Sequence, residues 1–190
     1  MIYDLIPTEV VKQITGTTDN TVAVSQGRAI VGMVQAYLGL VLVKQDFCKE
    51  KVTLPYPFSK VIRPMYAPIN SVSFLGVITN NGTYKADTNA ISVGEFTIEV
   101  LPHFWGCFRP HLPYGVSSVQ MSYNAGLYSN WAEVPGILQE AMSELLKYKY
   151  SADYAAGFQS EHFGDYSYTK GSFVKGLPVE IAGMLDNLQL

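Results

Sequence analysis

The spacing of apolar residues changes twice along this 190-residue chain, and no other feature limits its fold as strongly. Between residues 30 and 41, apolar side chains recur every three or four positions, which is typical of one face of a helix. From residue 71 to 123 they alternate with polar side chains, as in half-buried strands. Between 137 and 146 the helical spacing returns. Because helices and strands are segregated along the chain, we expect an α+β fold rather than a parallel α/β sheet.

The first helical segment is predicted to span residues 20–38. Asp19 or Thr18 would cap its N-terminus, because a short polar side chain there accepts hydrogen bonds from unpaired backbone N–H groups. Gly39 would end the helix, since glycine adopts the left-handed conformation common at that position. The apolar stripe that predicts this helix begins at Ile30 and continues past the helix end, through Val31, Val34, Leu38 and Val41.

A second, longer helix is predicted from residue 134 to 154 or 156, ending near Gly157. Pro135 suits the first helical position, where its missing N–H group has no partner to lose. Glu144 precedes Lys147 by three residues, the spacing of an ion pair on a helix surface. The predicted apolar face consists of Ile137, Leu138, Ala141, Leu145 and Leu146.

Between these helices, residues 49–123 predict an antiparallel β module of about five or six strands. Asn80-Asn81-Gly82 is typical of a tight hairpin turn. Prolines between residues 55 and 68 divide the first part of the module into short extended pieces. Three sets of alternating residues are expected to face the core: Val72, Phe74 and Gly76; Phe96, Ile98 and Val100; and Val119, Met121 and Tyr123.

The C-terminal part of the chain predicts an aromatic arm followed by a short helix. Residues 157–176 contain several Phe and Tyr side chains but no periodicity, so we expect a loop there. Pro178 then begins an amphipathic segment that would fold back or dock on a neighbour. Residues 1–156 are therefore interpreted as a core and residues 157–190 as an arm. The apolar side of the terminal helix consists of Ile181, Met184, Leu185 and Leu188.

A search for catalytic chemistry finds one weak candidate. His103, Cys107 and His111 recur at four-residue spacing, which suggests a small metal- or thiol-dependent enzyme. Neighbouring prolines and Gly106 favour an irregular aromatic loop over a metal site. No Gly-Lys-Ser/Thr phosphate loop or Gly-x-Ser-x-Gly nucleophile motif is present. The sequence therefore predicts no catalytic residue, no bound metal and no cofactor.

The composition limits the classes of function. The chain is only 15% charged, against about 25% in typical soluble proteins, while 48% of it is hydrophobic and 13% aromatic. This excludes intrinsic disorder, and the net charge of −3 argues against a dedicated basic nucleic-acid reader. Few charges and many aromatic residues favour a surface covered by partners. We expect no signal peptide, no membrane span, and two reduced cysteines, Cys48 and Cys107.

Three motifs in series give the chain a resemblance to the head–tail connector (adaptor) proteins of tailed bacteriophages. The strand, turn and helix pattern "V-x-V-x-Y-x-A-G-Y", then "V-P", then "L-x-x-A-x-x-x-L" is matched by Val119, Met121, Tyr123, Ala125, Gly126, Tyr128 (one position late), Val134, Pro135, Leu138, Ala141 and Leu145. The pattern "R-P-x-x-x-P-I-x-S-V" is matched by Arg63, Pro64, Pro68, Ile69, Ser71 and Val72. The C-terminal pattern "Y-S-Y-(T/S)" before "L-P" is matched by Tyr166, Ser167, Tyr168, Thr169, Leu177, Pro178 and Leu185. The stretch from Lys85 to Leu112 is longer and more aromatic than in compact members.

The resemblance implies a structural role in a virion. Such adaptors form homo-oligomeric rings of about a dozen subunits that bind under the portal protein, extend the DNA channel without sequence-specific binding, and recruit the next neck or tail protein. The implied location is the virion neck, after synthesis in the host cytoplasm. A stopper or a tail terminator is the alternative within this class. The implied portal-docking residues are Tyr166, Tyr168, Phe173, Leu177, Pro178, Ile181, Leu185 and Leu188. The candidate subunit-interface residues are Gly27, Gly32, Trp105 and Phe108, although packing inside the subunit explains the two glycines equally well.

Overall fold

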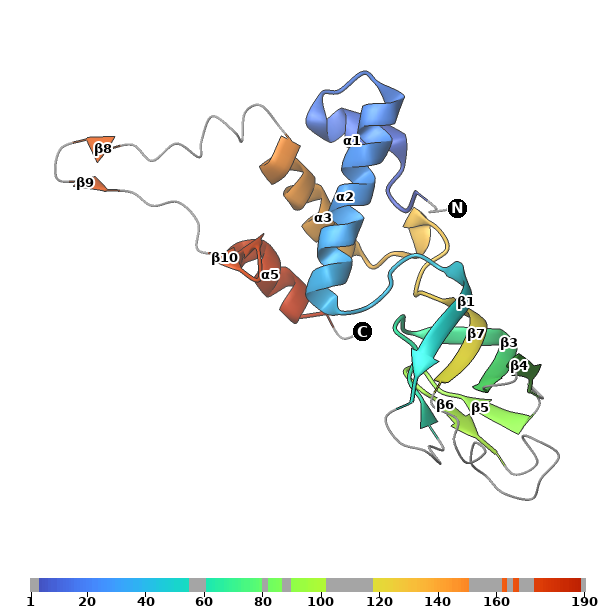
Figure 1. Ribbon diagram of the computed structural model, residues 1–190. Coiled ribbons are helices and arrows are strands. Elements are labelled where there is room, and N and C mark those ends of the chain that lie inside the picture. The colour runs from blue at the N-terminus through green and yellow to red at the C-terminus, as the bar shows by residue number, and fades with distance from the viewer. Residues whose placement is uncertain are drawn as a thin grey trace. The chain divides into compact units, whose positions relative to one another are not determined.

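A computed structural model shows two compact units, one helical and one built of strands (Figure 1). It describes residues 4–54, 61–79, 82–86, 90–101, 118–150, 162–163, 166–167 and 173–188. The helical unit comprises Asp4–Gly39 and Tyr128–Leu190, and the β unit comprises Met1–Tyr3 and Leu40–Leu127. The α+β fold class predicted from the sequence is confirmed. Among the described residues, no helix is long and apolar enough to cross a membrane.

The predicted first helix is confirmed as α2 (Asn20–Leu38). The Asp19 side chain accepts hydrogen bonds from the backbone N–H groups of Thr21 and Val22, at 2.7 and 3.3 Å. Gly39 ends the helix in the left-handed conformation, with φ of 70°. A shorter helix, α1 (Thr8–Thr15), packs against α2 and α3 (Gly136–Tyr150). It was not predicted, because two turns carry too little periodicity to stand out.

The long helix α3 spans Gly136–Tyr150, after a single 3-10 turn, η2 (Trp131–Glu133). The Pro135 carbonyl accepts hydrogen bonds from the N–H groups of Leu138 and Gln139, both at 2.9 Å. Pro135 therefore precedes the first helical residue instead of occupying it. Residues 151–157, where the helix was predicted to end, lie outside the described residues.

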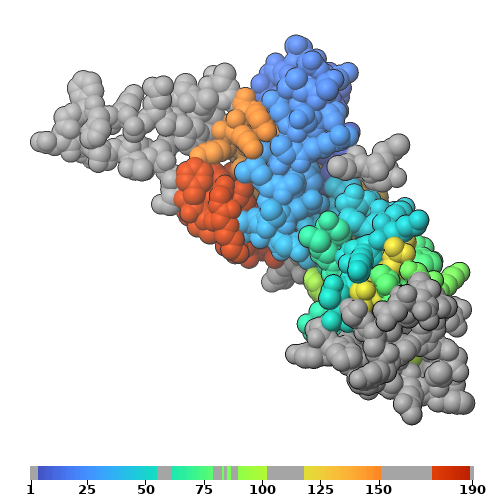
Figure 2. All heavy atoms as spheres, viewed as in Figure 1, coloured from blue at the N-terminus to red at the C-terminus, as the bar shows by residue number. Residues whose placement is uncertain are grey.

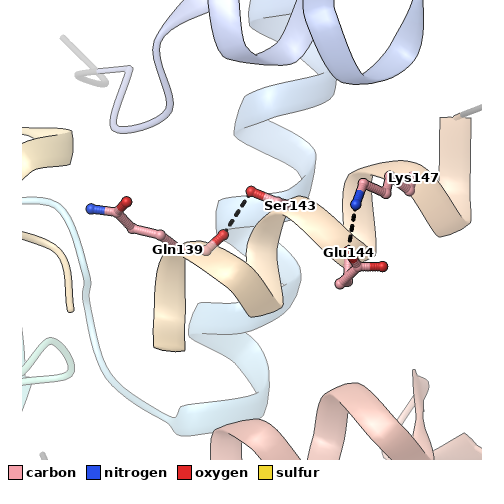
Figure 3. Close-up of polar contacts among 4 residues, drawn as sticks. All are labelled: Gln139, Ser143, Glu144 and Lys147. Carbon is pink, nitrogen blue, oxygen red and sulfur yellow. Dashed lines mark hydrogen bonds and ion pairs between the residues drawn. The ribbon is translucent and has the colours of Figure 1, made fainter. Parts of the chain in front are cut away.

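The buried face of α3 differs from the prediction at one position. Ile137 is 39% exposed, and Met142 is fully buried with the other predicted residues. The reason is the 3.6-residue period, which places position 142 inside a stripe through 138, 141, 145 and 146 and leaves position 137 at its margin. On the outer side, the Ser143 hydroxyl donates to the Gln139 carbonyl at 2.8 Å, and Lys147 pairs with Glu144 at 2.5 Å as predicted (Figure 3).

Seven described strands form the β unit (Figure 1). They are β1 (Gln45–Thr53), β2 (Val61–Ile62), β3 (Ile69–Thr79), β4 (Gly82–Lys85), β5 (Ile91–Val93), β6 (Ile98–Val100) and β7 (Ser118–Ala125). One antiparallel sheet has the order β1-β7-β3-β4, and a second has the order β2-β6-β5. Both sheets contribute to a single apolar core. The module thus begins at Gln45, earlier than predicted, and it has seven described strands where five or six were expected.

The central strand β7 confirms the alternation read from the sequence. Val119 and Met121 are fully buried and Tyr123 is 1% exposed. The predicted hairpin is also present, since Thr79 at the end of β3 pairs with Gly82 at the start of β4. The two connecting residues, 80 and 81, lie outside the described residues.

Two other predicted sets are correct only in part: Val72 packs against the apolar core as predicted, and Ile98 and Val100 are buried in it. In β3, Leu75 and Val77 are fully buried, and Phe74 and Gly76 lie on the opposite face. The pairing with β7 contains two register shifts, the second between Val72 and Phe74. Such a bulge inserts one extra residue and reverses the face of all that follow. Phe96 lies before β6 rather than in it and is 51% exposed.

Candidate interaction surfaces

The described residues offer no metal centre. No group of three or more His, Cys, Asp or Glu side chains gathers among them as a metal site requires. His103, Cys107 and His111, the trio of the enzyme hypothesis, lie outside the described residues, as do Trp105 and Phe108. Exposed apolar side chains are therefore the features of the described surface that suggest a function.

The C-terminal segment begins with a hairpin. β10 (Phe173–Val174) pairs antiparallel with β11 (Leu177–Pro178). Lys175 and Gly176 connect the two strands with φ of 48° and 84°, as a two-residue type I′ turn requires. The loop predicted for residues 157–176 is therefore wrong for its last residues, and also at residues 162–163 and 166–167, which form two short paired strands. Both side chains of β10 are exposed, at 56% and 40%.

The terminal helix predicted after Pro178 is present as α5 (Val179–Asp186). It packs against α3, and its buried side consists of Ile181, Ala182 and Leu185, each at most 4% exposed. In Figure 2 the atoms of this segment (red) lie against those of α2 (blue) and α3 (orange). The apolar side of the helix is thus covered by the chain itself.

The eight residues predicted to dock onto a portal fall into three groups. Phe173 is 56% exposed and Leu188 is half-buried. The backbone of Tyr166 lies in β9 (Tyr166–Ser167), which pairs with β8 (His162–Phe163), and Tyr168 lies outside the described residues. The remaining four are buried within the helical unit: Leu177, Pro178, Ile181 and Leu185.

Tyr37 on α2 contacts both ends of this C-terminal segment. Its hydroxyl donates a hydrogen bond to Oδ1 of Asp186 at 2.8 Å, and this bond is the main cause that raises the pKa of Tyr37. The Lys175 Nζ atom lies 5.2 Å from the centroid of the Tyr37 ring. Phe173 meets Tyr148 of α3 edge-on, with ring centroids 6.0 Å apart. These contacts join residues up to 149 positions apart, so no local pattern could reveal them.

The two glycines proposed as interface residues differ in their surroundings. A Cβ atom on Gly27 would lie 3.3 Å from Cγ2 of Val11 and 3.8 Å from Cβ of Ile6. The space beside Gly27 is therefore filled within the chain, which is the alternative that the sequence left open. Gly32 is exposed, and its Cβ position meets no described heavy atom within 4 Å. Gly32 alone of the two is open to another subunit.

In the β unit, a partly buried polar network fixes the loop that carries an exposed methionine. The Tyr123 hydroxyl donates to Glu50 and accepts from the N–H group of Tyr66 at 3.3 Å. Glu50 also accepts from the N–H group of Met65 at 2.9 Å, and Phe47 stacks on Tyr66 with centroids 4.1 Å apart. Burial, followed by the hydrogen bond to Glu50, raises the pKa of Tyr123. Met65 itself is 78% exposed.

Comparison with known proteins gives this fold a context. No family model matches the sequence, and no curated protein sequence matches it. A chain in the neck of an empty gene transfer agent particle with C6 symmetry matches with a TM-score of 0.58 at 16% identity, over 98% of this chain and 91% of that one. A chain in the neck of the native particle with C12 symmetry matches with a TM-score of 0.56 at 17% identity, over 100% and 97%. The protein has the fold of a neck chain.

A third match gives the same result. It is a chain in the virion of the native gene transfer agent particle, with a TM-score of 0.59 at 16% identity, over 96% of this chain and 88% of that one. The resemblance to head–tail connector proteins inferred from the sequence motifs is thus confirmed at the level of the fold.

Proposed function

We propose that this protein is a structural virion protein, a head–tail connector adaptor in the neck of a phage-like particle. The observation that carries the proposal is the extent of the fold match, which covers at least 96% of this chain and at least 88% of each neighbour. A shared module of general use would match only part of both chains. The proposal contains no catalytic step, metal or cofactor.

The subunits are proposed to form a closed ring. The neighbouring neck structures have C6 and C12 symmetry, and a head-to-tail contact repeated about one axis closes into such a ring. Each subunit then needs two different contact surfaces. Candidates are the exposed Met65 and Phe96 of the β unit, and Gly32 with the exposed Val174 of β10 in the helical unit. Methionine suits such a contact because its side chain adapts to irregular surfaces.

The ring is proposed to bind under the portal, extend the DNA channel and recruit the next neck protein. Of the predicted docking residues, those buried within the helical unit hold α5 in place and are not available on the free subunit. Portal contact is therefore assigned to Phe173 and to the stretch that carries Tyr166 and Tyr168. A net charge of −3 suits a channel through which DNA passes without being retained.

Electron microscopy and portal binding test this proposal together. Purified protein should form rings alone or on addition of portal complexes, and Phe173→Ser should weaken portal binding at least tenfold. Val22→Ser is the matched control, because Val22 is also exposed (43%) but lies on α2. Protein that forms no rings and ignores portals contradicts the proposal. Protein that binds tails instead of portals, scored by order of addition, indicates a stopper or tail terminator.

A further inference from the structure

In an assembled ring, α5 can pack against the helical unit of its own subunit or against that of a neighbouring subunit. The helix has eight residues, and isolated helices shorter than about 12 residues are marginal in water. It therefore needs an apolar partner surface to stay folded. Within the chain that surface is α3, together with Tyr37 of α2, which contacts Asp186 at the C-terminal end of α5. A neighbouring copy offers the same surface.

The connection between α3 and the C-terminal hairpin is far longer than docking within one chain requires. Neighbouring helices in bundles are usually joined by about 2–8 residues. Here residues 151–172 separate the end of α3 from β10, a total of 22. Residues 162–167 contain the β8–β9 pairing. The other 16 residues of this connection can span up to about 55 Å when extended, several times the diameter of a helix, which is about 10–12 Å.

We infer that in the assembled ring α5 of each subunit packs onto α3 and Tyr37 of the next subunit. This inference rests on the proposed ring. Exchange of an identical element between copies retains every contact that the element makes within one chain, so it is a low-cost route to assembly. The buried side chains of α5, the Tyr37–Asp186 hydrogen bond and the Tyr148–Phe173 ring contact would all form between subunits instead of within one. The exchange links each subunit to its neighbour.

Crosslinking with a short bismaleimide distinguishes the two arrangements. In full-length protein with Cys48 and Cys107 replaced by Ser, Tyr37→Cys and Asp186→Cys place two thiols at the ends of a 2.8 Å hydrogen bond. Both positions are at the surface, so the variant should fold. Dilute unassembled protein should give a monomer-sized product with an internal link. Rings should give a ladder of covalent dimers, trimers and larger species on a denaturing gel. The variant with Tyr37→Cys alone is the control and should give no ladder.

Each outcome bears on the inference separately from the proposed function. Rings that yield a ladder support exchange of α5 between neighbours. Rings that yield only monomer-sized, internally linked chains overturn the exchange and leave the ring proposal intact. Protein that forms no ring by electron microscopy overturns the ring proposal and the exchange with it.

Discussion

Gly126 carries the sharpest prediction about this fold, because its backbone leaves no room for a side chain. Its φ is 123°, and a Cβ atom there would lie 2.3 Å from the Val43 carbonyl oxygen and 2.7 Å from the Lys44 nitrogen. Its N–H group donates to the Pro68 carbonyl at 2.9 Å, and its own carbonyl accepts from Asn70. Gly126 therefore cannot move away from Val43 and Lys44 without breaking these hydrogen bonds.

Gly126→Ala should destabilise the protein by about 4 kcal/mol. Holding a non-glycine residue at such a φ costs about 1–3 kcal/mol, and forcing a methyl group into packed backbone costs about 1–3 kcal/mol more. With a urea m-value of about 2 kcal/mol/M for a chain of this size, the unfolding midpoint should fall by about 2 M. Urea titration followed by far-UV circular dichroism measures the shift directly.

Two other glycines provide graded controls. A Cβ atom on Gly76 would approach only side-chain ends, Cγ2 of Thr83 at 2.7 Å and Cζ of Phe74 at 2.8 Å. These can rotate, so Gly76→Ala should cost about 1–2 kcal/mol. Gly136 begins α3, and no described heavy atom lies near its Cβ position. Gly136→Ala should therefore raise the free energy of unfolding by up to about 1 kcal/mol. A midpoint for Gly126→Ala within about 0.3 M of the parent would refute the reasoning.

Further substitutions test the cap of α2, the partly buried polar network around Tyr123 and the C-terminal segment. Asp19→Ala should lower the free energy of unfolding, measured by urea titration, by about 1 kcal/mol, because two N–H groups lose their acceptor. Asp19→Asn should change it by no more than a few tenths of a kcal/mol. Tyr123→Phe should cost about 1–3 kcal/mol at pH 7. The pKa of Tyr123 is raised in the folded state, so its contribution to the free energy of unfolding is complete below pH 10. As the pH rises further, this contribution falls by about 1.4 kcal/mol per pH unit. The phenylalanine variant should lack this part of the alkaline loss of stability. Leu185→Ala, at a position 2% exposed, should cost about 2–5 kcal/mol, whereas Phe173→Ser should change the melting temperature by no more than about 2 °C.

Much of the fold was predictable because local patterns decide local structure. Helix α2 begins and ends where its cap residues predicted, since capping involves backbone groups only two to four residues away. Strand β7 alternates as predicted, because the extra residues at the register shifts opposite Met121 to Tyr123 lie on β1 and β3 and not on β7. The Lys175-Gly176 turn was overlooked although its pattern was available, with a glycine following a polar residue between two apolar pairs.

The candidate surfaces were less predictable because they depend on contacts between distant residues. The sequence indicated an aromatic, apolar C-terminal segment but could not show which of its side chains the chain itself covers. Met65 was overlooked altogether, since its exposure follows from a network in which Glu50 and Tyr123 are 73 positions apart.

By itself, the sequence determined the order and type of the main elements, the α+β class and the resemblance to connector proteins. The periodicity of apolar residues and the capping of helices depend on residues within one turn of helix or along one strand, so both can be recognised in a single sequence. The tertiary structure alone decided which face of β3 is buried, that Phe96 is exposed and that α5 lies on α3. These features depend on strand register and on packing between segments far apart in the chain, and a register shift of one residue exchanges the buried and exposed faces.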